Sequence, residues 1–195
     1  MKKMYRPIGV KELDLILNTG CRRYPPRLPT QPIFYPVLNQ EYAIEIAQKW
    51  NTKDNNSGFC GYVTEFNIDK HYVSKYETHI VGSSKHEELW VPAELLSEFN
   101  SYIQAPILIS NAFYGERYEA IENHIEKFIQ LLELKKYNPM DFSCQVQAEW
   151  KMVTHHYMAW VKHDFNNYVC DYDKANLLSS LRKTLVDNMK WFFTF

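Results

Sequence analysis

The sequence predicts an α+β protein, with a mixed core over residues 1–112 and an all-helical extension over residues 113–195. In the first part of the chain, segments with apolar residues at helical spacing alternate with segments whose pattern repeats every two residues. After Gly115, amphipathic helical patterns follow one another and little strand signal returns. Hydrophobic residues make up 46% of the chain and charged residues 23%, which is close to the globular average and argues against wholesale disorder.

The first predicted elements are an extended segment, a helix and a long loop. Residues 5–6 precede Pro7, which favours an extended backbone before it. Apolar residues at helical spacing run from Gly9 to Gly20, and Gly20 is placed to end that helix. Residues 21–38 hold five prolines and are predicted to form a loop, whose many aromatic and aliphatic residues argue against disorder.

A second helix and three strands are predicted next. Asn39 is a good N-cap for a helix whose apolar face runs to Trp50. Alternation with a period of two predicts a strand over residues 59–68 and weaker strands over residues 76–81 and 87–91.

The remaining predicted elements are mostly helical. A helix is expected to begin near Pro92, and one more strand is expected over residues 105–110. Helical patterns then cover residues 121–132, 143–165 and 173–193.

Charge and cysteine usage exclude several classes of protein. The 22 basic and 23 acidic residues leave a net charge of -1, so no bulk field indicates a nucleic-acid or membrane partner. No stretch approaches the roughly 20 apolar residues of a membrane span, and the N-terminus lacks the apolar run of a signal peptide. The cysteines form no close pair and predict neither a disulfide framework nor a metal knuckle: Cys21, Cys60, Cys144 and Cys170. We therefore expect a reduced, cytoplasmic protein.

Few residues match the familiar catalytic motifs. With only six glycines, the sequence has no phosphate-binding glycine loop, dinucleotide fingerprint or nucleophile elbow. His156 and His163 lie two helical turns apart and could share a face, but their spacing supplies no third ligand. Structural or surface histidines are therefore favoured over a metal site, and no metal is expected.

The most suggestive group of residues is the acidic start of the strand over residues 87–91. Alternation places Glu88 and Trp90 on one face of this strand and Glu87 on the other, so one carboxylate is expected to face inward. A carboxylate beside apolar walls is a setting for catalysis. A charge that protects an edge strand from aggregation is an equally good interpretation.

Four segments, in their order along the chain, carry a resemblance to a known family. They are Tyr5-Arg6, then Pro32-Ile33-Phe34-Tyr35-Pro36, then Tyr42-Ala43 with Ile46-Ala47, then Glu88-Leu89-Trp90-Val91-Pro92. This set resembles the ADP-ribosyltransferase fold, and most closely small bacterial proteins that carry an ADP-ribosylation/crystallin label. The last segment is also similar to the glutamate strand of DNA-modifying ADP-ribosyltransferase toxins. The resemblance covers roughly the first 110 residues, and the helical extension matches no family.

The resemblance implies a split, strongly bent sheet that binds NAD as a substrate. It implies a glycosyltransferase that cleaves the nicotinamide–ribose bond and passes ADP-ribose to a protein or nucleic-acid acceptor. Glu88 takes the catalytic position, favoured over Glu87 by its four-residue step to Pro92. The residues implied to contact NAD are Tyr5, Arg6, Arg22, Arg27, Phe34 and Tyr35.

Two other functions stay open. A non-catalytic binding protein would expose an apolar patch around Trp150, Trp160 and residues 191–195. A relative of the NAD-dependent RNA 2'-phosphotransferases would surround the pocket with basic residues. The apolar segment 189–195 is expected to dock within the chain or to join a homodimer through the C-terminal helices.

Overall fold

The computed structural model describes the backbone of residues 1–118 and 120–194, and the side chains of these residues except 120–123. Contacts divide the chain into two compact units, Met1–Arg117 with Phe192–Phe195, and Tyr118–Trp191. The first unit mixes strands and helices and the second is helical, so the predicted α+β class with C-terminal helices is confirmed at this level. The sequence places a boundary after residue 112, whereas the contacts place it after Arg117 and return the last residues to the first unit.

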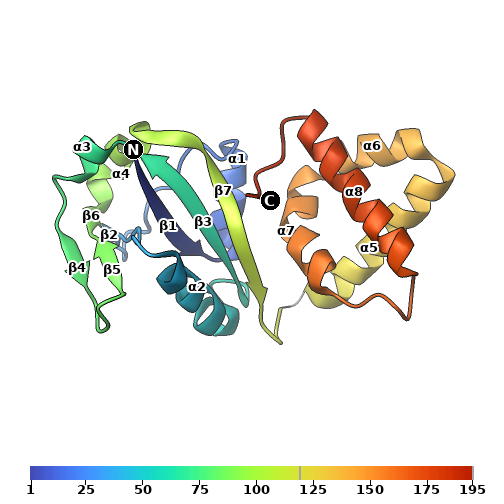
Figure 1. Ribbon diagram of the computed structural model, residues 1–195, viewed down its shortest axis with the longest axis horizontal. Helices are drawn as coiled ribbons and strands as arrows, with labels where there is room; N and C mark the ends of the chain where they lie inside the picture. Colours follow the sequence, from blue (N-terminus) through green and yellow to red (C-terminus); the bar gives the residue numbers. More distant parts are fainter. Residues whose placement is uncertain (119, 195) are drawn as a thin grey trace. The chain divides into compact units, whose positions relative to one another are not determined.

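The centre of the first unit is a three-stranded antiparallel sheet in the order β1-β3-β7 (Figure 1). Its strands are β1 (Lys2–Ile8), β3 (Cys60–Ile68) and β7 (Ile103–Tyr114). The predicted strands over residues 59–68 and 105–110 are confirmed, and β7 is longer at both ends. The pairing of β3 with β7 shifts register twice, between Val63 and Thr64 and between Glu65 and Asn67.

Two smaller strand pairs lie beside this sheet. The hairpin of β4 (Thr78–Ile80) and β5 (Glu87–Leu89) pairs His79 with Glu88, and β2 (Ile33–Phe34) pairs with β6 (Val91–Pro92). The strands β4 and β5 correspond to the weaker strands predicted over residues 76–81 and 87–91, whereas β2 lies in the segment predicted to be a loop.

Val37 lies between the hairpin and the central sheet. The backbone N–H and C=O of Val37 both bond to Tyr5 of β1, at 2.8 and 2.9 Å, and on its other side Val37 bridges Glu88 of β5. The N–H of Leu89 donates to the carbonyl of Pro36 at 2.9 Å. At Val37 the long proline-rich loop therefore lies between β1 and β5 like a short strand. It brings these two strands close together.

One face of the sheet is covered by α2 (Gln40–Lys49). The side chain of Asn39 accepts bonds from the N–H groups of Glu41 and Tyr42, as its predicted role as N-cap requires. Ala43 and Ala47 of this helix pack on Val63 of β3. A Cβ atom at Gly61 of β3 would lie 2.2 Å from the carbonyl oxygen of Ala47, so only glycine allows α2 to approach the sheet this closely.

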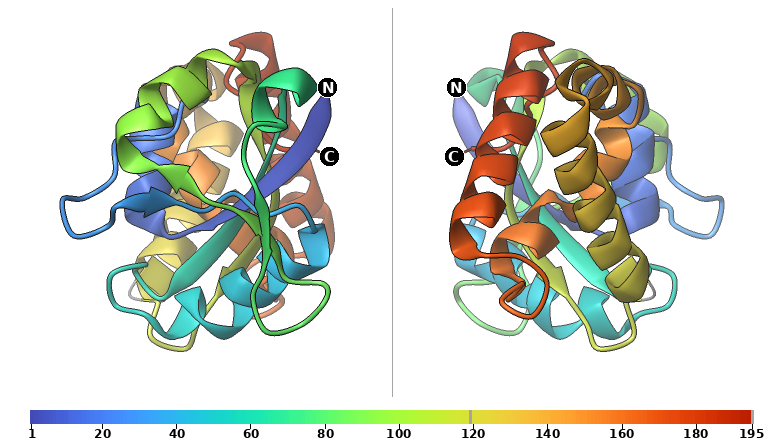
Figure 2. Two further views of the ribbon diagram at one scale, coloured as in Figure 1. Left: turned by 90° about the vertical axis from the view of Figure 1, so that its left-hand side faces the viewer. Right: turned by 90° about the vertical axis from the view of Figure 1, so that its right-hand side faces the viewer.

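The opposite face is covered by α1 (Val10–Asn18) and the loop that follows it (Figure 2). The predicted helix between Gly9 and Gly20 is confirmed. Aromatic rings fill this side: Tyr24 packs on Phe34 and Phe66 with ring centroids 5.1 and 5.3 Å apart, and Phe34 packs on Phe99 at 5.4 Å. The loop over residues 21–38 is thus ordered by its aromatic side chains.

The shorter elements of this unit surround these layers. They are η1 (Asn51–Lys53), α3 (Lys70–Val73), η2 (Ala93–Leu95) and α4 (Leu96–Ser101). The helix predicted to begin near Pro92 is present, but its first turn is a 3-10 helix.

Four helices form the second unit: α5 (Ala120–Tyr137), α6 (Pro139–Ala148), α7 (Trp150–Lys162) and α8 (Asp171–Asp187). Phe128 of α5 stacks on Phe165 with ring centroids 4.0 Å apart and meets Trp160 of α7 at 5.8 Å. The single helix predicted over residues 143–165 is wrong, because the chain breaks at Glu149 into α6 and α7. Among the described residues, no helix is long and apolar enough to cross a membrane.

The last described residues extend the central sheet. Phe193 forms a parallel bridge with Ile109 of β7, whose N–H donates to the carbonyl of Phe192 at 2.6 Å. Both phenylalanines are buried. Phe192 and Phe193 thus dock within the chain, one of the two outcomes expected for segment 189–195, whereas Met189 is exposed.

Candidate active site

A pocket of about 400 Å³ lies where β1, the Val37 segment and β5 meet. Its lining comes from residues far apart in the sequence: Arg6, Pro7, Tyr35, Val37, Ile46, Val81, Glu88 and Trp90. This volume is in the range of pockets that hold small molecules. Three residues singled out from the sequence, Arg6, Tyr35 and Glu88, therefore meet around one cavity.

Glu88 is the acidic group of this pocket, and both of its carboxylate oxygens are held. The hydroxyl of Tyr42 donates to Oε1 at 2.8 Å, and the indole Nε1 of Trp90 donates to Oε2 at 3.0 Å. Glu88 is half-buried in the middle of β5, between the backbones of His79 and Val37. A carboxylate held by two donors, one at each oxygen, points in one direction.

Tyr42 is the residue that ties Glu88 to α2. Burial, together with the hydrogen bond to the Glu88 carboxylate, raises the pKa of Tyr42 to about 12. Its hydroxyl therefore stays protonated and acts as a donor throughout the physiological range.

The mouth of the pocket is aromatic. Trp90 is 42% exposed and Tyr35 is 37% exposed, and their rings meet edge to face with centroids 5.9 Å apart. The ring of His79 stacks on Trp90 at 4.2 Å. Exposed aromatic faces beside a carboxylate are suited to a planar, electron-poor ring.

Arg6 lies at the other end of the pocket and is already paired. Nε and Nη2 donate to the two carboxylate oxygens of Glu12 at 2.8 and 3.1 Å, and Nη1 donates to the carbonyl of Tyr35 at 3.1 Å. The guanidinium also lies over the Phe34 ring, 4.5 Å from its centroid. Most of its bonding capacity is used within the protein, so Arg6 positions Tyr35 and contributes its charge at short range.

A second pocket of about 660 Å³ adjoins the first at Arg6 and Pro7. Arg27 lines it, with Nε donating to the carbonyl of Ile33 at 3.1 Å and Nη1 4.0 Å from Glu12. Burial, and then the charge of Arg6, lowers the pKa of Arg27. Two guanidinium groups thus share the single carboxylate of Glu12, and this leaves a positive charge at the junction of the two pockets.

Other predicted contact residues lie away from these cavities. The ring of Phe34 is fully buried in the aromatic core, and Tyr5 packs beside α2 while its backbone pairs with Val37. Arg22 is exposed, and neither pocket includes it in its lining. Glu87 is half-buried and does not line the first pocket, so the structure brings Glu88 and not its neighbour to the cavity.

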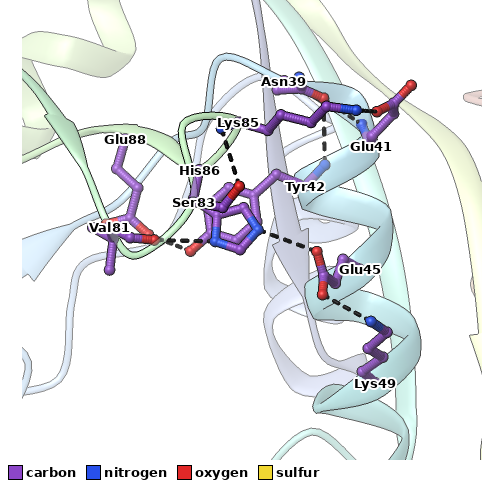
Figure 3. A network of polar contacts seen from close by, with 10 residues as sticks. All are labelled: Asn39, Glu41, Tyr42, Glu45, Lys49, Val81, Ser83, Lys85, His86 and Glu88. Atoms are coloured by element: carbon purple, nitrogen blue, oxygen red, sulfur yellow. Dashed lines mark hydrogen bonds and ion pairs between the residues drawn. The ribbon is translucent and has the colours of Figure 1, made fainter.

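Sequence reasoning missed the residues that orient Glu88. Tyr42 enters the sequence prediction only as part of the motif order that carries the resemblance, and no role is predicted for Glu45 or His86. Figure 3 shows these three side chains close together between α2 and the turn before β5. The one signal in the sequence is that Tyr42 lies in the first turn of a helix with a good N-cap, which fixes the position of its backbone.

Three histidines of the second unit lie close together, with His124 buried and His156 and His163 half-buried. His124 lies 5.9 Å from His156 and 5.6 Å from His163, measured between ring centroids. Burial lowers the pKa of His124 to about 4, and burial also lowers the pKa of His156 to about 4. Within the described part of the chain, no group of histidine, cysteine and acidic residues is arranged to hold a metal ion.

The four cysteines are free thiols, two buried and two exposed. In comparisons with known proteins, no family model, no curated protein and no solved structure matches the chain.

Proposed function

We propose that the chain is an NAD-dependent ADP-ribosyltransferase with Glu88 as its catalytic carboxylate. The observation that carries the proposal is the convergence of Glu88, Tyr35 and Trp90, with the Arg6 charge, around one pocket of about 400 Å³. The joined small sheets and the ordered motifs are in keeping with a split sheet of ADP-ribosyltransferase type. No metal is needed for this chemistry.

The proposed reaction needs a fixed negative charge beside a ribose. When the bond between the nicotinamide nitrogen and the ribose carbon breaks, its electron pair leaves with nicotinamide and positive charge develops on the ribose. The Glu88 carboxylate, held by Tyr42 and Trp90, stabilises that charge without having to reorient. Tyr35 and Trp90 offer faces for the nicotinamide ring.

The remainder of NAD reaches toward the second pocket in this proposal. The excess positive charge of Arg6 and Arg27 over Glu12 favours the pyrophosphate at the junction of the two pockets. The acceptor, a protein or a nucleic acid, approaches from the open, aromatic mouth.

Specific features also bear on the alternatives. Trp160, Phe192 and Phe193 are buried, so much of the apolar surface expected of a binding protein is already covered within the chain. The basic lining of the second pocket would also serve an RNA 2'-phosphotransferase, which makes a 2'-phosphorylated RNA a necessary control substrate. Free cysteines favour a reducing compartment, and we propose the cytoplasm.

The test is release of nicotinamide from NAD by the purified protein, alone and with cell lysate. Glu88→Gln keeps the shape of the side chain and removes its charge, and Glu87→Gln is the matched control one residue away. We expect Glu88→Gln to lower release at least about 100-fold, in the range of losses seen when one transition-state contact is removed, with an unchanged melting temperature. Release by Glu87→Gln should equal that of the unmodified protein.

Equal release by the Glu88→Gln protein would remove Glu88 from the mechanism. No release under either condition, together with no shift in melting temperature on adding NAD, would favour a non-catalytic binding protein.

A further inference from the structure

The turn over residues 81–86 is attached to α2 through the side chain of His86 (Figure 3). Nδ1 of His86 lies 3.0 Å from the carbonyl oxygen of Val81, and Nε2 lies 3.2 Å from Oε2 of Glu45. The ring stacks on Tyr42 with centroids 4.0 Å apart and planes inclined by 11°. The side chain therefore contacts its own turn and two successive turns of the helix.

Both polar partners of His86 are hydrogen-bond acceptors. A backbone carbonyl and a carboxylate only accept hydrogen bonds, and a neutral imidazole carries a single N–H. Both contacts are therefore hydrogen bonds at the same time only in an imidazolium, in which both ring nitrogens carry a proton. The hydrogen bond from Lys49 is the largest cause that lowers the pKa of Glu45, and the bond to His86 adds to it, so the carboxylate is charged.

These contacts lead directly to the pocket. Val81, whose carbonyl faces His86, lines the pocket wall. Tyr42, which lies under the His86 ring, donates its hydroxyl to Glu88. A movement of His86 away from α2 would release a wall residue and loosen the residue that orients the carboxylate.

We propose that His86, as an imidazolium bonded to Glu45, is a positioning residue that holds the 81–86 turn against α2 and so fixes both Val81 and the Tyr42–Glu88 contact. Its effect on turnover rests on the proposed function, whereas its effect on the turn does not. The surrounding charges are Glu41, Glu45 and Lys49 on α2, and Lys85 and Glu88 on the hairpin. Lys85 is engaged with Glu41 at 3.3 Å, so Glu45 remains the acid that pairs with His86.

The test is hydrogen–deuterium exchange of the backbone amides of residues 78–89, with each rate divided by the intrinsic rate at the same pH. Histidine side chains change charge between about pH 5 and 8, and over this range protection of the segment should fall as the pH rises. In His86→Ala, exchange at low pH should be roughly tenfold faster, as expected for loss of a charge-assisted hydrogen bond, and should no longer depend on pH. The exposed His71→Ala is the matched control and should behave like the unmodified protein.

Glu45→Gln separates the charge from simple packing. A glutamine can donate its amide N–H to a neutral Nε2 while Nδ1 still donates to Val81, so both contacts survive deprotonation. We expect this variant to keep its protection at high pH, where the unmodified protein loses it. Exchange of β1 and β3 amides reports whether each variant is folded.

Two results would overturn the proposal. One is equal exchange of His86→Ala and unmodified protein at every pH; the other is an unaltered pH dependence in Glu45→Gln. If NAD is cleaved, His86→Ala should also lower kcat more than it raises KM, and Glu45→Gln should flatten the alkaline side of the pH profile. If NAD is not cleaved, the exchange data still decide the role of His86 by themselves.

Discussion

Arg6 illustrates how far a residue's position can be predicted without its role. Pro7 predicts that Arg6 lies on an extended segment. In the structure Arg6 lies in strand β1 and lines the first pocket. Its partner Glu12 lies in the first turn of α1, and nothing in the spacing of the two residues predicts a bidentate pair. The burial of Arg6 depends on Phe34 and Tyr35, which are distant in sequence.

Removal of the Glu12 charge should therefore destabilise the fold. In Glu12→Gln, the Arg6 guanidinium, whose side chain is only 8% exposed, would lose its compensating charge. Breaking a buried ion pair on one side costs about 3 kcal/mol, and we expect a loss of that order in urea unfolding. Lys3 on the same strand, whose side chain is 52% exposed in its salt bridge to Glu65, supplies the control, and Lys3→Ala should change stability little. A Glu12→Gln protein as stable as the control would show that Arg6 is not dependent on this pair.

Tyr42→Phe tests the orientation of Glu88 at the level of single atoms. The change removes only the hydroxyl that donates to Oε1, while the bond from Trp90 remains. A hydrogen bond to a charged group contributes about 1.5 kcal/mol, so we expect nicotinamide release to fall roughly tenfold. Tyr76→Phe, which removes a hydroxyl paired with Tyr72 outside the pocket, should leave release unchanged. An unchanged rate in Tyr42→Phe would mean that Trp90 alone orients the carboxylate.

At the scale of elements, the sequence pattern predicts those helices and strands that are stabilised by interactions between neighbouring residues. The helix capped by Asn39 and the strand at residues 60–68 are confirmed, because capping and alternation are properties of neighbouring residues. The strand contacts of Val37 escape prediction because their partners, Tyr5 and Glu88, are far away in sequence. The pocket depends on those contacts, so its existence could be suspected from the motif order but its lining could not be derived.

Removal of the C-terminal segment should lower the thermal stability of the protein. Phe192 and Phe193 bury their rings, and the backbone of Ile109 bonds to the segment at both its N–H and its C=O. Loss of two buried aromatic side chains costs several kcal/mol. Deletion of residues 190–195 should therefore lower the melting temperature by about 10 °C or more. Deletion of residues 1–2 at the other end provides a comparison, and equal melting temperatures for both truncations would contradict the docking.

At the scale of the whole molecule, acid should destabilise the protein through its buried histidines. Burial holds the pKa of His124 and of His156 near 4, below the value of about 6.5 that an unfolded chain gives. Their neutral forms contribute stability that is complete above about pH 6.5 and is lost as the pH falls toward 4, because the unfolded state then binds more protons. We expect a loss of at least about 1.4 kcal/mol over that interval, the equivalent of one pKa unit.

Thermal unfolding between pH 7 and pH 4 measures this effect. The double variant His124→Gln, His156→Gln should show a shallower dependence on pH than the unmodified protein, and the exposed His71→Ala should show the same dependence. Parallel curves for the double variant and the unmodified protein would mean that other groups control acid unfolding.

The close approach of α2 to β3 at Gly61 has a consequence for how this protein can vary. The helix carries Tyr42, Glu45 and Ile46, and its distance from the sheet is set by the close contact between Gly61 and Ala47. Any side chain at position 61 would act as a spacer that lifts the helix, and it would move Ile46 away from the pocket wall and Tyr42 away from Glu88. If the proposed function holds, a substitution at Gly61 would change NAD affinity without altering a residue that lines the first pocket.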